Sequence, residues 1–178
     1  METAGLAGLA IEDTDLPQPF GSGGKPSLLS IEEGVGKMRA AVAGRSDPDL
    51  VIAGRTSAPS VTNIEDAVAR AKAYEAAGVD AMFFSGVKTK DQIEALSAAL
   101  SIPIFLGGGG ADIGDIDYLS AKGVRISLQG HQPFMAAVQA THDTLKALRD
   151  GTKPADLKGV APPDLMQRVT RREKYQSN

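Results

Sequence analysis

Two acidic side chains follow the first short apolar stretch of the chain. Leu9 to Ile11 has the composition of a buried strand, and Glu12 and Asp13 come directly after it. Acidic groups at the carboxyl end of a buried strand are where α/β enzymes place metal-binding or acid–base groups. Glu12 is therefore a candidate ligand for Mg²⁺, directly or through water, and the alternative is an N-cap or a buried ion pair with Arg55. Asp13 is expected to cap the following turn with Thr14.

An arginine and a histidine follow two other apolar stretches. Arg55 comes directly after Leu50–Gly54, and a guanidinium there is suited to a bidentate grip on a substrate carboxylate. The alternative is a structural partner for Glu12, and one arginine can serve both roles. His131 follows Gln129-Gly130, where an imidazole can bind a carboxylate or move a proton near neutral pH. The alternative for His131 is a surface position at a helix N-terminus.

Two glycine-rich segments lie near these candidates. Gly21–Ser30 is polar, follows Glu12 closely, and has the composition of a lid that closes over substrate and excludes water. Lys25 and Ser27 are its candidate substrate contacts. Gly107–Gly110 lacks the Gly-Lys-Ser/Thr ending of a phosphate loop, so it is expected to be a flexible turn that keeps side chains away from the pocket rim.

Five apolar stretches, each followed by a helical pattern, position these residues. Continuous apolar runs are typical of parallel strands that are covered on both faces. From the third stretch onward the spacing between strands is about twenty residues, as in a barrel of repeated βα units. The chain therefore predicts a parallel α/β fold, with strands at 8–11, 50–54, 81–84, 102–106 and 124–128.

The helical segments carry recognisable start and stop signals. Ser30 and Glu33 form a capping-box pattern for a helix that runs to about Gly44, and Asn63 is the expected N-cap of a helix that ends at Gly78. Further helices are expected at 91–100, 113–121 and 133–150. Residues 1–150 are predicted to form one βα domain. Residues 151–178 are predicted to form a tail with a short amphipathic stretch, which either packs on a neighbouring subunit or is frayed.

Composition excludes several classes of function. The 178 residues suit one domain, and a net charge of −3 provides no basic field for nucleic acid or an anionic membrane. No stretch approaches the roughly 18 apolar residues of a membrane span, and no secretory signal pattern is visible, so a cytoplasmic location is expected. The absence of cysteine excludes disulfides, thiolate metal sites and thiol catalysis.

Several motifs resemble the isocitrate lyase/phosphoenolpyruvate mutase superfamily. The matching segments are GLAGLAIEDTDLPQPFG, SIEEGVGKMRAAVAGRSDPDLVIAGRTSA, EDAVARAKAYEAAGVDAMFFSGVKT and GVRISLQGHQPFMAAVQATHDTLKALRDGT. The resemblance implies a (β/α)8 barrel, usually tetrameric with its last helix exchanged between subunits. It implies Mg²⁺, with Mn²⁺ as a substitute, and chemistry on α-keto or α-hydroxy carboxylates through a metal-bound enolate of pyruvate. By resemblance, Glu12 is the metal-shell glutamate, Arg55 the carboxylate-binding arginine and Gly21–Ser30 the gating loop.

The branch that the chain resembles most closely is the oxaloacetate decarboxylases, in which a histidine at the position of His131 helps hold the substrate. Superfamily lyases that cleave by retro-aldol chemistry use a KKCGH-type loop, whereas the loop here is GSGGKPS and the chain has no cysteine. Lys25-Pro26-Ser27 also matches poorly the Lys-Thr-Asn set of mutases and hydrolases. Decarboxylation needs neither set. The predicted function is therefore magnesium-dependent decarboxylation of oxaloacetate, or of a related α-keto acid, to pyruvate.

Three alternatives to active decarboxylation remain. The first is mutase-type or other carbon–carbon lyase chemistry of the same superfamily. The second is a catalytically inactive remnant, because the family barrel has eight strands and this chain shows five. The three absent strands would carry the aspartate that binds the metal directly, so the chain is expected to be N-terminally truncated, and a homo-oligomer if the full barrel is present. The third is an independent flavodoxin-like domain that binds phosphate at Gly107–Gly110.

Overall fold

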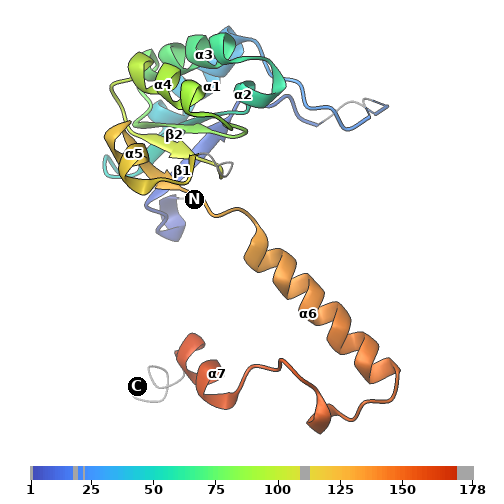
Figure 1. The fold of residues 1–178 in the computed structure, drawn as a ribbon. Helices are drawn as coiled ribbons and strands as arrows, with labels where there is room; N and C mark the ends of the chain where they lie inside the picture. Colours follow the sequence, from blue (N-terminus) through green and yellow to red (C-terminus); the bar gives the residue numbers. More distant parts are fainter. Residues whose placement is uncertain (1, 18–19, 22, 109–112, 172–178) are drawn as a thin grey trace. The chain divides into compact units, whose positions relative to one another are not determined.

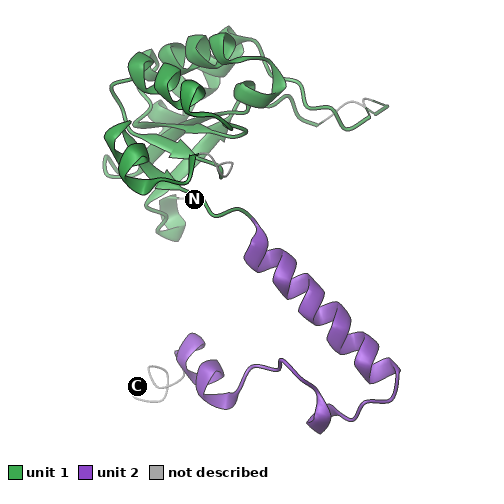
Figure 2. Ribbon diagram, viewed as in Figure 1, with its two compact units in different colours: residues 1–130 green, residues 131–178 purple. Residues whose placement is uncertain are grey.

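The computed structural model describes residues 2–17, 20–21, 23–108 and 113–171 (Figure 1). The chain divides into two compact units, residues 1–130 and 131–178 (Figure 2). The first unit contains the sheet and the second is helical. The domain boundary expected near residue 150 stays a prediction, whereas the division into compact units falls between Gly130 and His131.

The first unit is built on a parallel sheet whose strand order follows the chain order. The strands are β1 (Gly8–Glu12), β2 (Val51–Thr56), β3 (Ala81–Phe84), β4 (Ile104–Leu106) and β5 (Val124–Ser127). Each strand pairs in parallel with the next one along the chain. The α/β prediction is confirmed, with five βα units in the order of a partial barrel. The flavodoxin-like alternative is wrong, because that fold places its first strand between the second and the third.

Helices cover one face of this sheet (Figure 1). They are α1 (Ile31–Gly44), α2 (Ala58–Val61), α3 (Ile64–Ala76), α4 (Lys90–Ala99) and α5 (Ile116–Ala121), and a short 3₁₀ helix, η1 (Glu2–Ala4), precedes β1. The capping box of Ser30 and Glu33 is present, and the Asn63 side chain accepts a hydrogen bond from the Asp66 amide. The last helix of the unit begins at Ile116 rather than at Ile113, because the Asp115 carboxylate caps it.

The core lies between the helices and the sheet. Its largest fully buried side chains include Met38, Ile52, Tyr74, Met82, Phe84, Ile93, Leu96 and Leu106. The described helices of this unit leave the other face of the sheet uncovered (Figure 1). It lines an apolar hollow of about 400 Å³ with residues of all five strands, among them Val51, Phe83, Phe105 and Ile126. The expectation of strands covered on both faces is therefore wrong within the described part of this unit, because its helices pack on one side alone.

The second unit contains α6 (Gln132–Arg149), the short η3 (Pro154–Asp156) and α7 (Pro163–Val169). The helix predicted at 133–150 is confirmed as α6. Its apolar stripe, with Phe134, Val138 and Leu145, is exposed. None of the described helices combines the length and the apolar character that crossing a lipid bilayer requires.

Candidate active site

Glu12 and Arg55 lie side by side at the carboxyl ends of neighbouring strands. They are register partners in the β1–β2 pair, and Arg55 Nε lies 3.4 Å from Glu12 Oε2. The contact is an ion pair rather than an aligned hydrogen bond, because Nε is buried and has no hydrogen-bond partner among the described residues. The Arg55 side chain is 36% exposed and the Glu12 side chain 30%, so a small molecule can reach the pair. Two of the predicted site residues are thus brought together.

The guanidinium of Arg55 is also held by an aromatic ring. Its Cζ atom lies 4.9 Å from the centroid of Phe83, which is its register partner on β3. A guanidinium over an aromatic face gains cation–π attraction and has its plane restrained. Glu12 and Phe83 therefore orient Arg55 from two sides without using its hydrogen-bond donors. Such a guanidinium is preorganised for a carboxylate.

Glu12 has partners of its own within the chain. Thr14 Oγ1 donates a 2.6 Å hydrogen bond to Glu12 Oε1, and Lys37 Nζ on α1 donates one of 2.6 Å to the Glu12 carbonyl. Both carboxylate oxygens thus have a neighbour, one a hydroxyl and one a guanidinium. Direct coordination of a metal would crowd these contacts, whereas a metal-bound water could donate to a carboxylate lone pair that they leave unused.

A complete metal site is not formed by the described residues. They contain no group of three or more His, Asp or Glu side chains placed to hold an ion. Mg²⁺ prefers six oxygen ligands and keeps several waters, so Glu12 could be one contributor. The residues fit a magnesium ion only if further ligands come from water, substrate or groups outside this set.

The ends of β3 and β4 are closely packed. A side chain at Gly107 would bring its Cβ within 3.0 Å of Ser85 Oγ and 3.1 Å of the Phe83 ring. Gly108 has a φ of +99°, which L side chains rarely adopt. Gly109 and Gly110 lie outside the described residues. Gly107 therefore has no room for a side chain beside Ser85 and Phe83, and the interpretation of Gly107–Gly110 as a flexible turn at the pocket rim stays a prediction.

Lys25 and Ser27 lie in the segment between β1 and α1. Lys25 is exposed. The Ser27 hydroxyl lies 3.4 Å from Asp15 Oδ2, and the Ser27 carbonyl accepts a hydrogen bond from the Asp15 amide. Ser27 therefore contacts its own loop, and the roles of both residues toward substrate stay predictions. Ser22, within the same loop, lies outside the described residues.

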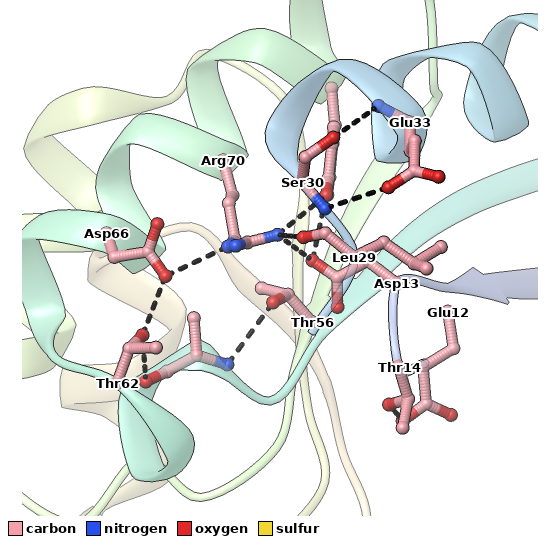
Figure 3. A network of polar contacts seen from close by, with 12 residues as sticks. Glu12, Asp13, Thr14, Leu29, Ser30, Glu33, Thr56, Thr62, Asp66 and Arg70 are labelled. Atoms are coloured by element: carbon pink, nitrogen blue, oxygen red, sulfur yellow. Dashed lines mark hydrogen bonds and ion pairs between the residues drawn. The ribbon is translucent and has the colours of Figure 1, made fainter. Parts of the chain in front are cut away.

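Asp13 is not the turn cap that the sequence suggested, and that prediction is wrong. Its side chain is fully buried, and Oδ2 accepts a hydrogen bond from Arg70 Nη1 at 3.1 Å (Figure 3). The same oxygen accepts a second hydrogen bond, of 2.8 Å, from the Tyr74 hydroxyl. Sequence reasoning missed this because Arg70 is 57 residues away. The available signal was the place of Arg70 beside Ala67, Ala71 and Tyr74, the buried residues of α3.

His131 belongs to the other unit. It is exposed at the N-terminal end of α6, and its side chain makes no capping hydrogen bond. Its role as a substrate contact stays a prediction. Glu12 and Arg55 are the predicted site residues that the first unit brings into contact.

Comparisons with known proteins agree with the fold of the chain. The sequence profile described as phosphoenolpyruvate phosphomutase matches residues 1–149. The chain belongs to this family. It is 54% identical over 171 residues to the oxaloacetate decarboxylase of Bradyrhizobium sp. (strain ORS 278), covering 96% of the chain and 59% of that relative. The oxaloacetate decarboxylase of Rhodopseudomonas palustris (strain BisB18) is 58% identical over the same length, with the same coverage. The chain thus spans about three-fifths of the length of these relatives.

Solved structures of the same superfamily have this fold. Phosphoenolpyruvate phosphomutase from Streptomyces platensis subsp. rosaceus matches with a TM-score of 0.82 and 25% identity, over 99% of this chain and 64% of that one. A phosphonopyruvate hydrolase in complex with oxalate and Mg²⁺ matches with a TM-score of 0.79 and 28% identity, over 99% of this chain and 62% of that one. An oxaloacetate acetylhydrolase in complex with the inhibitor 3,3-difluorooxalacetate matches with a TM-score of 0.80 and 26% identity, over 98% of this chain and 61% of that one. The predicted superfamily is confirmed.

Proposed function

We propose that this chain carries part of the active site of an oxaloacetate decarboxylase, in which Arg55 binds a carboxylate of the substrate. The observation that carries the proposal is the Arg55 guanidinium itself. It is oriented by Glu12 and Phe83 at the carboxyl end of the sheet, and no hydrogen bond to it occurs among the described residues. Relatives at 54% and 58% identity that are named oxaloacetate decarboxylase support the choice of substrate.

The chemistry breaks one carbon–carbon bond. The carboxylate β to the keto group leaves as CO₂, its bonding electron pair passes into the enolate of pyruvate, and a proton on the methylene carbon then completes pyruvate. Arg55 would hold the substrate so that the breaking carbon–carbon bond overlaps with the π orbitals of the keto group, into which its electron pair passes. The positive charge of Arg55 would also partly neutralise the negative charge of the dicarboxylate substrate. His131 is proposed as a second substrate contact, and Lys25 and Ser27 as contacts from the loop.

A magnesium ion is proposed near Glu12, and Mn²⁺ is the expected substitute. When bound, such an ion supplies positive charge toward the keto oxygen. The Mg²⁺ in the phosphonopyruvate hydrolase complex supports this choice for the family. Glu12 would hold the ion through water, because its oxygens already contact Thr14 and Arg55. A homo-oligomeric state and a cytoplasmic location stay predictions.

The test follows pyruvate formation from oxaloacetate with Mg²⁺, coupled to lactate dehydrogenase. Free magnesium decarboxylates oxaloacetate slowly, so the rate without protein is subtracted, and EDTA should remove the remainder. The proposal predicts a rate above this background that Arg55→Met abolishes and that Arg45→Lys, at the other end of the sheet, retains. A rate that equals the magnesium background contradicts decarboxylase activity of this chain.

A catalytically inactive chain is the second candidate, and the single carboxylate at the candidate metal position favours it. Such a chain would still have Arg55 in place. It would bind oxalate, the ligand of the hydrolase complex, without forming pyruvate. Calorimetric titration with oxalate, on the chain and on Arg55→Met, therefore separates the two candidates. Arg55-dependent binding with no turnover indicates the inactive chain, and binding with turnover indicates the enzyme.

A further inference from the structure

The loop that leaves the candidate site has two short stems that pair with each other. Residues 13–15 form the outgoing stem and residues 27–29 the returning stem. Thr14 and Leu28 form an antiparallel bridge, the Leu29 amide donates to the Asp13 carbonyl at 2.8 Å, and the Asp15 amide donates to the Ser27 carbonyl at 2.9 Å. The stems thus form a small ladder directly after β1.

Arg70 on α3 contacts both stems with one guanidinium (Figure 3). Its Nη1 lies 3.1 Å from Asp13 Oδ2 on the outgoing stem and donates a 2.8 Å bond to the Leu29 carbonyl on the returning stem. Its Nε donates to Asp66 Oδ2 at 2.9 Å, which fixes the other side of the plane. The Arg70 side chain is 8% exposed. A planar fork can bind several acceptors at fixed angles, and a lysine ammonium cannot reproduce that geometry.

Tyr74 completes this contact from the next turn of α3. Its hydroxyl donates to Asp13 Oδ2 at 2.8 Å, and Asp13 Oδ1 has no partner among the described residues. The orientation of the Asp13 carboxylate is therefore set by Arg70 and Tyr74. Gly34 of α1 makes room for this arrangement, because a Cβ there would lie 2.1 Å from the Tyr74 hydroxyl oxygen. Helix α1, the loop stems and α3 meet at this point.

Asp13 is directly connected to the candidate site. Its amide donates a 3.1 Å hydrogen bond to the Arg55 carbonyl, which extends the β1–β2 pairing by one residue. Its two neighbours in the chain are Glu12 and Thr14, which share a 2.6 Å hydrogen bond. A shift of Asp13 would therefore move the backbone of Glu12 and of Arg55 together.

We propose that Arg70 is a positioning residue for the Glu12–Arg55 pair and acts through Asp13. Its contribution to substrate binding rests on the proposed function, whereas its effect on the pair does not. Arg70 spans from α3 to both loop stems, so the rigid helix layer determines where the strand-end carboxylate and guanidinium lie. Buried groups that orient a binding residue commonly change affinity or activity by about 10–100-fold when they are altered.

Arg70 and Tyr74 both keep their protons over the neutral range. Burial lowers the pKa of Arg70, but its hydrogen bonds to Asp66 and Tyr74 and the charges of Asp13 and Asp66 outweigh burial, so the pKa is raised. Burial and the contact with Asp13 raise the pKa of Tyr74, which therefore remains a donor. Both groups are accordingly constant hydrogen-bond donors to Asp13 over this range.

The test compares Arg70→Lys with Arg45→Lys. Arg45 is a matched control, because it also pairs with an aspartate, Asp80 at 2.6 Å, but at the other end of the sheet. The first readout is the Nε–H signal of Arg55 in ¹H–¹⁵N NMR spectra, assigned by its loss in Arg55→Lys. The second is the rate at which chymotrypsin cleaves after Phe20, a fully exposed side chain between the stems, identified by fragment mass. The third is the affinity for oxalate.

Arg70→Lys should shift the Arg55 signal, speed cleavage after Phe20 and weaken oxalate binding by about tenfold, whereas Arg45→Lys should change none of these. Tyr74→Phe keeps the ring and removes the hydroxyl, which donates to Asp13 Oδ2 and accepts from Arg70 Nη1 at 3.4 Å. Because the Arg70 guanidinium stays in place, this variant should change each readout in the same direction by less. It also serves as the test if Arg70→Lys does not fold. An unchanged Arg55 signal in folded Arg70→Lys and Tyr74→Phe overturns the proposal, as do equal effects of Arg70→Lys and Arg45→Lys. Failure of the parent chain to bind oxalate contradicts the proposed function, and the Arg55 signal still decides the role of Arg70.

Discussion

The two ends of the sheet each carry an arginine–carboxylate pair, and the pairs differ in how completely they are bonded. At the amino end, Arg45 Nη1 donates to Asp80 Oδ2 at 2.6 Å and to the Leu50 carbonyl at 2.9 Å. The same Asp80 oxygen accepts from the Ile52 amide at 2.8 Å. At the carboxyl end, Arg55 has a 3.4 Å ion pair and an aromatic neighbour but no hydrogen bond among the described residues.

Exposure does not explain this difference. The side chains of the amino-end pair are 21% and 35% exposed, and those of the carboxyl-end pair 36% and 30%. What differs is the number of donors already in use. A saturated pair supports the fold, whereas an oriented guanidinium with free donors can bind an anion. The Glu12–Arg55 pair is thus the one whose guanidinium retains unused donors, and the Arg45–Asp80 pair is its more fully bonded counterpart.

The largest effect is expected from removing the buried arginine behind the carboxyl end. Arg70→Met would leave the Asp13 carboxylate buried without its cation, which destabilises a protein by about 3–5 kcal/mol. The free energy of unfolding in urea measures this. The double variant Asp13→Asn/Arg70→Met removes the charge as well and should recover part of the loss. A loss below about 1 kcal/mol in Arg70→Met would show that Asp13 is not held as an ion pair.

The next largest effect is expected at Arg55, and it concerns binding rather than stability. Hydrogen bonds to charged groups contribute about 1.5–3 kcal/mol, so Arg55→Met should weaken oxalate binding by roughly a hundredfold. Because the ion pair with Glu12 is partly exposed, stability should change by less than about 1 kcal/mol. Calorimetry and urea unfolding on the same variant measure both quantities. A stability loss without a binding loss would make Arg55 a structural residue like Arg45.

A smaller effect is expected at the amino end of the sheet, and there it concerns stability rather than binding. Asp80→Ala removes the acceptor of both Arg45 and the Ile52 amide. Leaving these partly buried donors without a partner should reduce the free energy of unfolding by about 1–3 kcal/mol. Oxalate affinity should stay within about twofold of the parent chain. A clear loss of oxalate affinity would mean that the two ends of the sheet are coupled.

The smallest effect is expected from pH, again at the amino end. The hydroxyl and amide of Ser101 donate to Glu75 Oε1 at 2.5 and 2.9 Å, and these bonds lower the pKa of Glu75 from its ordinary 4.5. A folded-state pKa below the unfolded value stabilises the protein above pH 4.5 and loses that contribution as the pH falls below it. Ser101→Ala should therefore lower the melting temperature slightly at pH 7 and less at pH 3. Equal losses at both pH values would contradict a role for the charged form of Glu75.

Features that depend on neighbours in the chain were predictable. The Ser30–Glu33 capping box and the Asn63 cap occur where the sequence indicates them, because both are contacts over three residues. The five strands were recognisable as apolar runs, with boundaries that differ by at most two residues. Helix α2, with four residues, was not anticipated, because so short a segment has no periodicity to detect.

Features that depend on distant residues were not predictable. Asp13 has the composition of a turn residue, yet its partners Arg70 and Tyr74 lie 57 and 61 positions away. Arg55 and Glu12 were expected near one another because parallel strands end at one edge, but the contact with Phe83 needed the register of β2 and β3. The glycine at position 34 had no visible purpose until the Tyr74 hydroxyl was placed against it.

By itself, the sequence determined the alternation of strands and helices, the polar residues at the strand ends and the family resemblance, because these are carried by local patterns and by residue order. The tertiary structure decided which polar groups are bonded and which retain free donors. That choice depends on distances between segments far apart in the chain, where a shift of about 1 Å separates a hydrogen bond from an unbonded contact. It is the reason that Arg45 and Arg70 are hydrogen-bonded into the fold, whereas the Arg55 guanidinium makes no hydrogen bond among the described residues.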